Sequence, residues 1–268
     1  MKRILVPTDF SEQAENALKV AAQLAKKNES EIYVLNSLEL PTHLSSSGAN
    51  GAMPESLFFI KLAEKYFEEL LKKPYLEGLL IHEAIIGHGE VYKDVNEVVK
   101  EKNIDLVIMG SQGTNGFMEL FIGSNTEKVV RTSEIPVLVI KNNHEDFKTD
   151  NFVYATDFSE ECKIPFNQAK KFAEGTNTHI NLLYINTPSE FKTTKEINTK
   201  IRSFIRDMDD SNFSVHIYND ISIEKGILNF ASETKDHMLC SDFVAFQTPV
   251  AHGTCVFTGN ARNGFSHL

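Results

Sequence analysis

A glycine-rich stretch at residues 110–126 carries the residue types that could bind a phosphate group. It follows an apolar run at residues 106–109, which predicts a buried strand, and it precedes a segment from Glu127 that has the pattern of a helix. Glycines let the backbone approach an anion and adopt positive φ angles, because they have no Cβ. N–H groups at the start of the following helix, with the positive end of its dipole, attract an anion. The pattern therefore predicts a phosphate-binding loop.

The spacing of this stretch, Gly110-x2-Gly113-x9-Gly123-Ser124, differs from two better known phosphate motifs. It is not closed by the Gly-Lys-Ser/Thr of a P-loop, and it lacks the G-x-G-x-x-G fingerprint of dinucleotide-binding proteins. No G-x-S-x-G motif surrounds Ser111 or Ser124, which argues against a serine hydrolase. The alternative to a ligand loop is a glycine-rich turn that only packs a strand against a helix.

Strand and helix patterns alternate through the first 140 residues. Strand-length apolar runs occupy residues 3–7, 32–35, 79–86, 105–109 and 135–140, and helical patterns lie between them at 12–27, 55–73, 91–102 and from 127. Continuously apolar strands are typical of a parallel sheet covered on both faces. Ligands of such sheets bind at the carboxyl ends of the strands. Thr8, Asp9 and Gly110 all lie at such ends.

The pattern restarts after a polar segment at residues 141–151. The sequence Thr-Asp-Phe-Ser at residues 8–11 recurs at residues 156–159, and strand and helix patterns then alternate to about residue 234. An internal repeat of this length predicts two copies of one domain. We therefore expect domains at residues 1–140 and 152–268, joined by a linker at 141–151.

The end of the second copy departs from the first. Residues 235–239 resemble the entry to the strand at 105–109, and residues 259–265 resemble part of the glycine-rich loop through a shared Asn-Gly-Phe. Residues 240–256 are then surplus, and no counterpart of Gly123, Ser124 or the last strand follows. We therefore expect a second copy that is incomplete or irregular at its C-terminus.

Composition excludes several classes of protein. The chain is 41% hydrophobic and 24% charged, as soluble globular proteins are, and its longest apolar runs are too short for a membrane span. A net charge of −10 without a basic stripe disfavours nucleic acid as a partner. The start of the chain has no signal-peptide pattern. The widely spaced Cys162, Cys240 and Cys255 favour free thiols in a cytoplasmic protein over disulfides or zinc. The spacing of His82, His88 and His216 also suggests structural roles.

The end of the first strand (Val6 to Ser11), the strand and loop at 105–126 and the closing strand at 136–140 together resemble the universal stress protein family, in its ATP-binding branch. The resemblance covers the first half of the chain and the second half to about residue 239. It implies two tandem α/β domains of the adenine-nucleotide α-hydrolase-like (Rossmann-like) type. Each would have a five-stranded parallel sheet of order 3-2-1-4-5. It also implies that the two domains pack as an intramolecular pseudo-dimer, with a homodimer of chains as a further possibility.

The resemblance also implies a site for ATP, with Mg²⁺ as a possible companion. Residues expected around the adenosine, at the ends of three strands, are Thr8, Asp9, Val34, Met109 and Gly110. Residues expected to cradle the phosphates are Gly113, Gly123, Ser124 and Asn125. Asp9 is the candidate metal ligand, because Mg²⁺ prefers carboxylate and phosphate oxygens.

Simpler roles stay open for some of these side chains. The carboxylate of Asp9 could instead interact with amides at the start of the following helix. Ser124 and Thr126 could be ordinary N-caps of the helix at Glu127, although their N–H groups would still face an anion.

Three functions are compatible with such a site. The first is an ATP-binding regulatory or stress-response protein without rapid turnover, and the second is a slow ATPase or phosphotransferase. The loop contains no lysine, and Lys128 and Arg131 come only in the following helix, which favours the first. The third is a structural or interaction protein without nucleotide. The second copy lacks Gly123 and Ser124, so we expect one working site and a degenerate partner domain.

Overall fold

The computed structural model describes residues 1–38, 52–86, 90–111, 124–140, 143–206, 208, 212–234, 238–241 and 255–257, with the backbone alone at 52–56, 84–86, 238–241 and 255–257. Within these residues, no helix is both long enough and apolar enough to cross a membrane.

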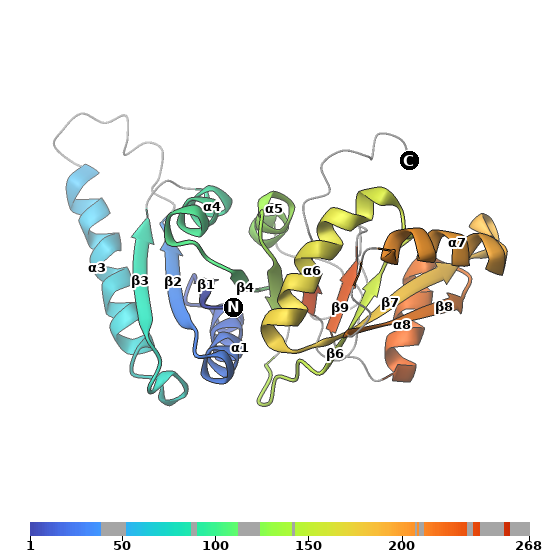
Figure 1. Cartoon of the computed structure of the whole chain (residues 1–268). Coiled ribbons are helices and arrows are strands. Elements are labelled where there is room, and N and C mark those ends of the chain that lie inside the picture. Colours follow the sequence, from blue (N-terminus) through green and yellow to red (C-terminus); the bar gives the residue numbers. More distant parts are fainter. Residues whose placement is uncertain are drawn as a thin grey trace.

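The first half of the chain forms a parallel sheet covered by helices (Figure 1). Its elements in chain order are β1 (Arg3–Pro7), α1 (Glu12–Asn28), β2 (Glu31–Ser37), α3 (Ala52–Leu70), η1 (Pro74–Leu76), β3 (Ile81–Ile86), α4 (Val91–Lys102), β4 (Leu106–Gly110), α5 (Ser124–Thr132) and β5 (Val137–Ile140). The strand order is β3-β2-β1-β4-β5, which confirms the predicted order 3-2-1-4-5.

The second half forms a second parallel sheet. Its elements are β6 (Asn151–Ala155), η2 (Glu160–Cys162), α6 (Lys163–Thr176), β7 (His179–Asn186), η3 (Pro188–Glu190), α7 (Thr194–Ile205), β8 (Phe213–Asn219), α8 (Ile223–Thr234), β9 (Met238–Ser241) and β10 (Cys255–Phe257). Its order, β10-β9-β6-β7-β8, is the order of the first sheet read from the other edge. The two halves therefore share one topology.

One expectation for the end of the chain is wrong. A counterpart of the last strand does exist, because β10 pairs in parallel with β9, with Cys255 opposite Met238. The first two residues of β10 lie within residues 240–256, the segment that we expected to be surplus to the repeat. Residues 259–265 follow this strand, so they cannot be the connection that corresponds to the glycine-rich loop. That connection is residues 242–254, half as many residues as the 111–136 that join β4 to β5.

Alternate residues of the central strands face different helix layers. In β1, Ile4 and Val6 pack with α1 and α3, whereas Leu5 packs with α4 and α5, and all three are fully buried. This two-sided burial is the reason why the strands are continuously apolar. The layer that contains α1 continues into the second half through Phe152 and Tyr154, so the two sheets share a hydrophobic core.

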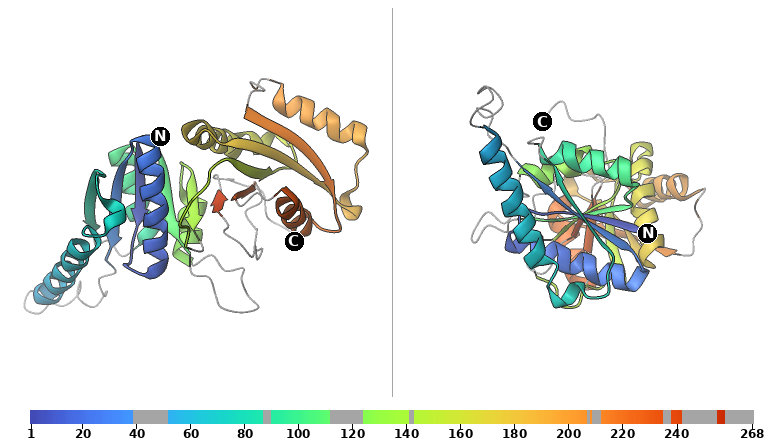
Figure 2. Two further views of the ribbon diagram at one scale, coloured as in Figure 1. Left: turned by 90° about the horizontal axis from the view of Figure 1, so that it is seen from below. Right: turned by 90° about the vertical axis from the view of Figure 1, so that its left-hand side faces the viewer.

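The two sheets also meet through polar contacts and at their edges. Edge strands β5 and β10 contact each other. Gln168 of α6 donates a hydrogen bond from Nε2 to the Glu134 carbonyl, before β5, at 2.9 Å. The segment that connects the two sheets is held by Gln23 of α1, which donates to the His144 carbonyl at 2.9 Å. Figure 2 shows α3 and α7 at opposite ends of the molecule, far from this contact.

Candidate functional site

A pocket of about 340 Å³ opens at the carboxyl ends of β1, β2 and β4. Three helices, α1, α4 and α5, begin around it, so three helix N-termini border one cavity. The described residues that line it are Pro7, Thr8, Asp9, Ser11, Gln13, Ala14, Leu35, Ser37, Val91, Met109, Gly110, Ser124, Asn125 and Thr126. This is the edge of the sheet at which the strand pattern predicted a ligand.

A tight turn after β1 presents Asp9 to the pocket. Phe10 adopts a left-handed backbone conformation with φ of 63°, and its N–H donates to Thr8 Oγ1 at 2.9 Å. The Ser11 N–H donates to Asp9 Oδ1 at 3.0 Å, and Ser11 caps α1 by accepting from the Ala14 N–H at 3.3 Å. Asp9 itself is exposed. Its carboxylate therefore supports the turn with one oxygen while facing solvent at the mouth of the pocket.

The aromatic ring of Phe10 anchors this turn to the core. It lies 5.1 Å from the rings of both Tyr66 and Phe67, on α3. The Thr8 N–H donates to the Leu35 carbonyl at 2.8 Å, which ties the turn to the end of β2. Such anchoring explains why a non-glycine residue is tolerated at a positive φ angle.

Gly110, at the end of β4, lies against the start of α1. A Cβ at this position would lie 2.8 Å from the backbone nitrogen of Ala14 and nearer still to the carbonyl of Gln13. Glycine is therefore required here for steric reasons. The missing Cβ allows β4 and the start of α1 to pack closely at the floor of the pocket. Thr126 Oγ1 donates to the Gly110 carbonyl at 3.2 Å and fixes the first turn of α5 over the strand end.

The first turn of α5 supplies the donors suited to an anion. Ser124, Asn125 and Thr126 begin the helix and line the pocket. Backbone N–H groups at the start of a helix have no intrahelical acceptor, and the helix dipole adds positive potential there. This arrangement can hold a phosphate without a cationic side chain.

Most of the predicted site residues within the described part of the chain line this one pocket: Thr8, Asp9, Met109, Gly110, Ser124 and Asn125. Val34 does not line it, because its side chain is fully buried on the α1 side of the sheet, and its neighbour Leu35 lines the pocket instead. Gly113 and Gly123 lie outside the described residues.

Sequence reasoning expected Val34 on the β2 side of the pocket and missed Ser37, which lines the pocket together with Leu35. The apolar run predicted a strand at 32–35, but β2 continues to Ser37, which pairs with Ile86 of β3. Ser37 lines the pocket and donates a hydrogen bond to Oδ2 of Asp94, a fully buried residue of the first turn of α4. A polar residue just after the apolar run of a strand was the signal that could have identified it.

The donor set fits a nucleotide phosphate, and Asp9 is the one carboxylate among the lining residues that the structure describes. Mg²⁺ in nucleotide sites is commonly held by one or two carboxylates together with phosphate oxygens. Within the described ranges no group of three or more acidic, cysteine or histidine side chains could hold a metal by itself.

Histidines in the described strands have structural partners. His82 stacks on Tyr33 with ring centroids 4.5 Å apart, and its Nε2 lies 3.2 Å from Glu31 Oε2. His216 Nε2 lies 3.1 Å from Asn181 Oδ1. These contacts agree with the structural roles predicted for His82 and His216, whereas His88 lies outside the described residues.

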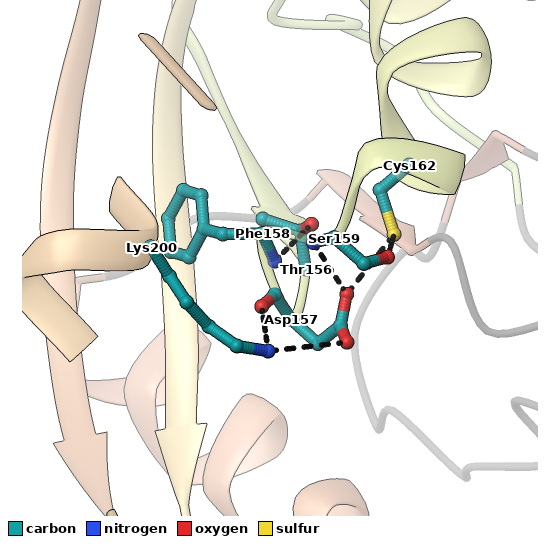
Figure 3. A network of polar contacts seen from close by, with 6 residues as sticks. All are labelled: Thr156, Asp157, Phe158, Ser159, Cys162 and Lys200. Atoms are coloured by element: carbon teal, nitrogen blue, oxygen red, sulfur yellow. Dashed lines mark hydrogen bonds and ion pairs between the residues drawn. The ribbon is translucent and has the colours of Figure 1, made fainter. Parts of the chain in front are cut away.

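The second sheet repeats the turn after its central strand β6. Phe158 again has a positive φ, of 58°, and the Ser159 N–H donates to Asp157 Oδ1 at 2.9 Å. Here the carboxylate has further partners (Figure 3). Lys200 of α7 lies with Nζ 3.7 Å from Asp157 Oδ2 and donates to the Asp157 carbonyl at 3.2 Å, and the Cys162 thiol donates to Oδ1 at 3.2 Å.

These partners shift the titration of the cluster. Burial tends to raise the pKa of Asp157, but hydrogen bonds from Ser159 and Cys162 and the charge of Lys200 outweigh it and leave that pKa lowered. Burial raises the pKa of the Cys162 thiol, and the neighbouring Asp157 raises it further against a lowering by Ser159. Asp157 therefore favours its charged form and has partners from beyond its own turn, Lys200 among them.

The sequence profile of the Universal stress protein family matches residues 1–141. The chain belongs to the universal stress protein family. A universal stress protein of Methanocaldococcus jannaschii is 34% identical over 158 residues, which cover 53% of this chain and 96% of that protein. Another, of Bacillus subtilis, is 27% identical and covers 52% of this chain and 98% of its own length.

The fold likeness extends over both sheets. A crystal structure of a universal stress protein from Archaeoglobus fulgidus has a TM-score of 0.73 to this chain, with 19% sequence identity. It covers 97% of this chain and 98% of its own chain. The curated relatives therefore match about half of the chain, and a universal stress protein of known structure has the fold of the whole.

Proposed function

We propose that this universal stress protein binds ATP in the pocket of its first sheet and acts as a nucleotide-dependent regulatory protein. The observation that carries this is the convergence of Thr8 and Asp9, Gly110, and the N-terminus of α5 on one cavity of about 340 Å³. Ligand pockets of small molecules are commonly of this size or somewhat larger. The hydroxyl, amide and carboxylate groups around it suit a phosphorylated ligand with a sugar.

With the strand order β2-β1-β4, the nucleotide would lie across the carboxyl ends of these strands, with its phosphates and its base at opposite sides of β1. Phosphates belong at the first turn of α5, beside Ser124 and Asn125, where the helix N-terminus attracts anions. Asp9, at the end of the middle strand, is placed to accept from ribose hydroxyls or to hold Mg²⁺ on the phosphates. The base then lies toward β2, where Leu35 and Val91 supply apolar surface.

Binding without rapid hydrolysis is favoured because the lining residues that the structure describes include no lysine or arginine side chain. Phosphoryl transfer relies on cations and on a group that orients the attacking water or hydroxyl. A multiple-turnover ATPase assay with Mg²⁺ checks this: we expect turnover well below the ordinary enzyme range of about 1–1000 per second, and turnover within it would contradict the proposal.

The second sheet is proposed to belong to a degenerate domain, at residues 152–268, joined to the domain at 1–140 by residues 141–151. Lys200 and Cys162 engage the carboxylate that corresponds to Asp9. The connection from β9 to β10 is also half as long as its counterpart in the first domain. Contact between β5 and β10 supports an intramolecular pseudo-dimer of these domains.

The direct test is to look for nucleotide carried by the purified full chain. Denaturing the protein and separating the released small molecules should yield ATP or ADP at up to one mole per mole of chain. Protein that neither carries nor takes up nucleotide would instead favour the structural or interaction role.

A further inference from the structure

A second pocket, of about 390 Å³, lies between α1 and the segment that connects the two sheets. It shares no lining residue with the pocket at the strand ends. Its volume is within the usual range of small-molecule sites. Helix α1 supplies Lys19, Ala22, Gln23 and Lys26, whose spacing of three or four residues places them on one face of the helix, and η1 supplies Tyr75. The connecting segment forms the opposite wall.

The side chain of Gln23 holds the connecting segment against α1. Its Nε2 donates to the His144 carbonyl at 2.9 Å, and its Oε1 accepts from the Phe147 N–H at 2.7 Å. The Phe147 ring packs against the core, with its centroid 5.5 Å from that of the His144 ring. One turn further along α1, Lys27 Nζ donates to Thr149 Oγ1 at 3.2 Å. Both walls of the pocket are therefore fixed by contacts within the protein.

Two lysines bring positive charge to this pocket. Within the part of the chain that the structure describes, neither Lys19 nor Lys26 forms an ion pair with an acidic side chain, and Lys19 Nζ donates to the neutral Asn16 Oδ1 at 3.4 Å. Glu145 is the one acidic residue among the described lining residues. The lining thus has an excess of positive charge in a chain whose net charge is −10. Such a local excess attracts anions.

Tyr75 and Ala22 give the same pocket an apolar surface. The Tyr75 hydroxyl donates to Glu15 Oε1 at 3.4 Å, and Lys73 pairs with the same carboxylate at 3.2 Å, so the orientation of the ring is fixed. Burial raises the pKa of Tyr75, and Glu15 raises it further, so the phenol is neutral and adds no negative charge. Ala22 is almost fully buried and leaves space beside the ring. The pocket therefore combines two ammonium groups with an aromatic surface.

We propose that this pocket is a second ligand site, for a small organic anion. A phosphate or carboxylate group of the ligand accepts charge-assisted hydrogen bonds from Lys19 and Lys26, which are stronger than neutral ones. The apolar or aromatic part of the ligand packs against Ala22 and the Tyr75 ring. Because the pocket lies between α1 and the connecting segment, a bound anion adds to the contacts that join the two halves of the chain. The site is independent of the proposed nucleotide function.

Calorimetric titration of the full chain with phenyl phosphate, which carries a dianion on an aromatic ring, tests this. The unmodified protein should bind it saturably at one molecule per chain, with and without an excess of ATP. Lys26→Met should weaken binding at least about fivefold, because one of two charge-assisted contacts is lost, and the double variant Lys19→Met/Lys26→Met should weaken it further. Inorganic phosphate, which lacks the ring, should bind more weakly. Benzoate compares a carboxylate with the phosphate, and the tighter ligand identifies the preferred anionic group.

The matched control is Lys61→Met, which removes the same charge from an exposed position of α3 outside the pocket and should leave the affinity unchanged. Circular dichroism establishes that each variant is folded. Three results would overturn the site: no saturable binding, an equal loss of affinity in Lys61→Met, or unchanged affinity in the folded double variant. Displacement of phenyl phosphate by ATP would place it in the pocket at the strand ends and would overturn the site as well. Failure of the protein to bind ATP bears on the proposed nucleotide function alone.

Discussion

Gly110 and Gln13 lie in backbone contact, so that the end of β4 and the first turn of α1 leave no space for a side chain between them. This contact joins the two walls of the pocket that come from different segments of the sequence. Met109 and Gly110 line one wall, and Gln13 and Ala14 line the other. The shape of the site therefore depends on a residue without a Cβ.

We expect Gly110→Ala to lower the free energy of unfolding by about 1–3 kcal/mol, because the backbone must shift to admit the new methyl group. It should also weaken ATP binding, since the same shift moves the floor of the pocket. Urea denaturation and ATP titration measure the two effects. The control is Gly78→Ala, which strains a residue with φ of 78° but meets no atom within 4 Å and lies outside the pocket. Equal effects of both variants on ATP affinity would contradict the account.

Asp9→Asn should weaken the binding of Mg·ATP by about tenfold or more. The amide keeps an oxygen for the Ser11 N–H but loses the charge that holds a cation or accepts strongly from a hydroxyl. Asp157→Asn is the matched control, because it makes the same change in the same turn of the second sheet. It should leave ATP affinity unchanged. Isothermal titration of the two full-length variants compares their affinities for ATP. A larger loss of affinity in Asp157→Asn than in Asp9→Asn would mean that the ligand binds at the second sheet and not at the first.

The Asp157 cluster makes a small, pH-dependent contribution to stability. Burial raises the pKa of Asp157 in the folded protein, but hydrogen bonds and the charge of Lys200 outweigh it and leave the pKa lowered. The folded state therefore favours the charged form of Asp157. The contribution is therefore complete above the ordinary aspartate pKa of about 3.9 and is lost as pH falls below it. Because the ion pair is partly solvated, it should amount to less than about 1 kcal/mol.

Unfolding free energies of the unmodified protein and Asp157→Asn, compared between pH 3 and 7, check this. The difference should be constant above about pH 5 and shrink toward zero in more acidic solution. A difference that grows as the pH falls would mean that the folded state favours the protonated acid.

Cys162 should react slowly with alkylating reagents. Its side chain is buried, burial raises its pKa, and the charge of Asp157 raises it further, so little thiolate is present near neutral pH. Peptide mapping after brief treatment with iodoacetamide at pH 7.5 measures the extent of modification at this residue. Labelling of Cys162 in native protein as fast as in urea-unfolded protein would contradict this environment.

The strands of the first sheet and the recurrence of its first turn after β6 could be predicted from sequence because local signals specify them. Continuously apolar runs predicted the strands of the first half, whereas their order was implied only by the resemblance to a known family. The repeated Thr-Asp-Phe-Ser gave two turns with the same geometry, in which Phe10 and Phe158 have φ angles of 63° and 58°.

Other features depend on tertiary packing more than on local sequence. Ser37 belongs to β2 because the ladder to β3 continues past the apolar residues, not because of its own hydrophobicity. Lys200 reaches Asp157 from a helix more than 40 residues away, at a spacing that no motif predicts. Strand β10 spans only Cys255–Phe257 and is defined by its pairing with β9 rather than by its length.

We expect one nucleotide site per chain, in the pocket of the first sheet. Calorimetric titration of the full chain with ATP and Mg²⁺ measures both the affinity and the number of sites. Binding should be saturable at one ATP per chain, with the same stoichiometry in Asp157→Asn. Absence of binding, or two sites per chain with one lost in Asp157→Asn, would contradict it.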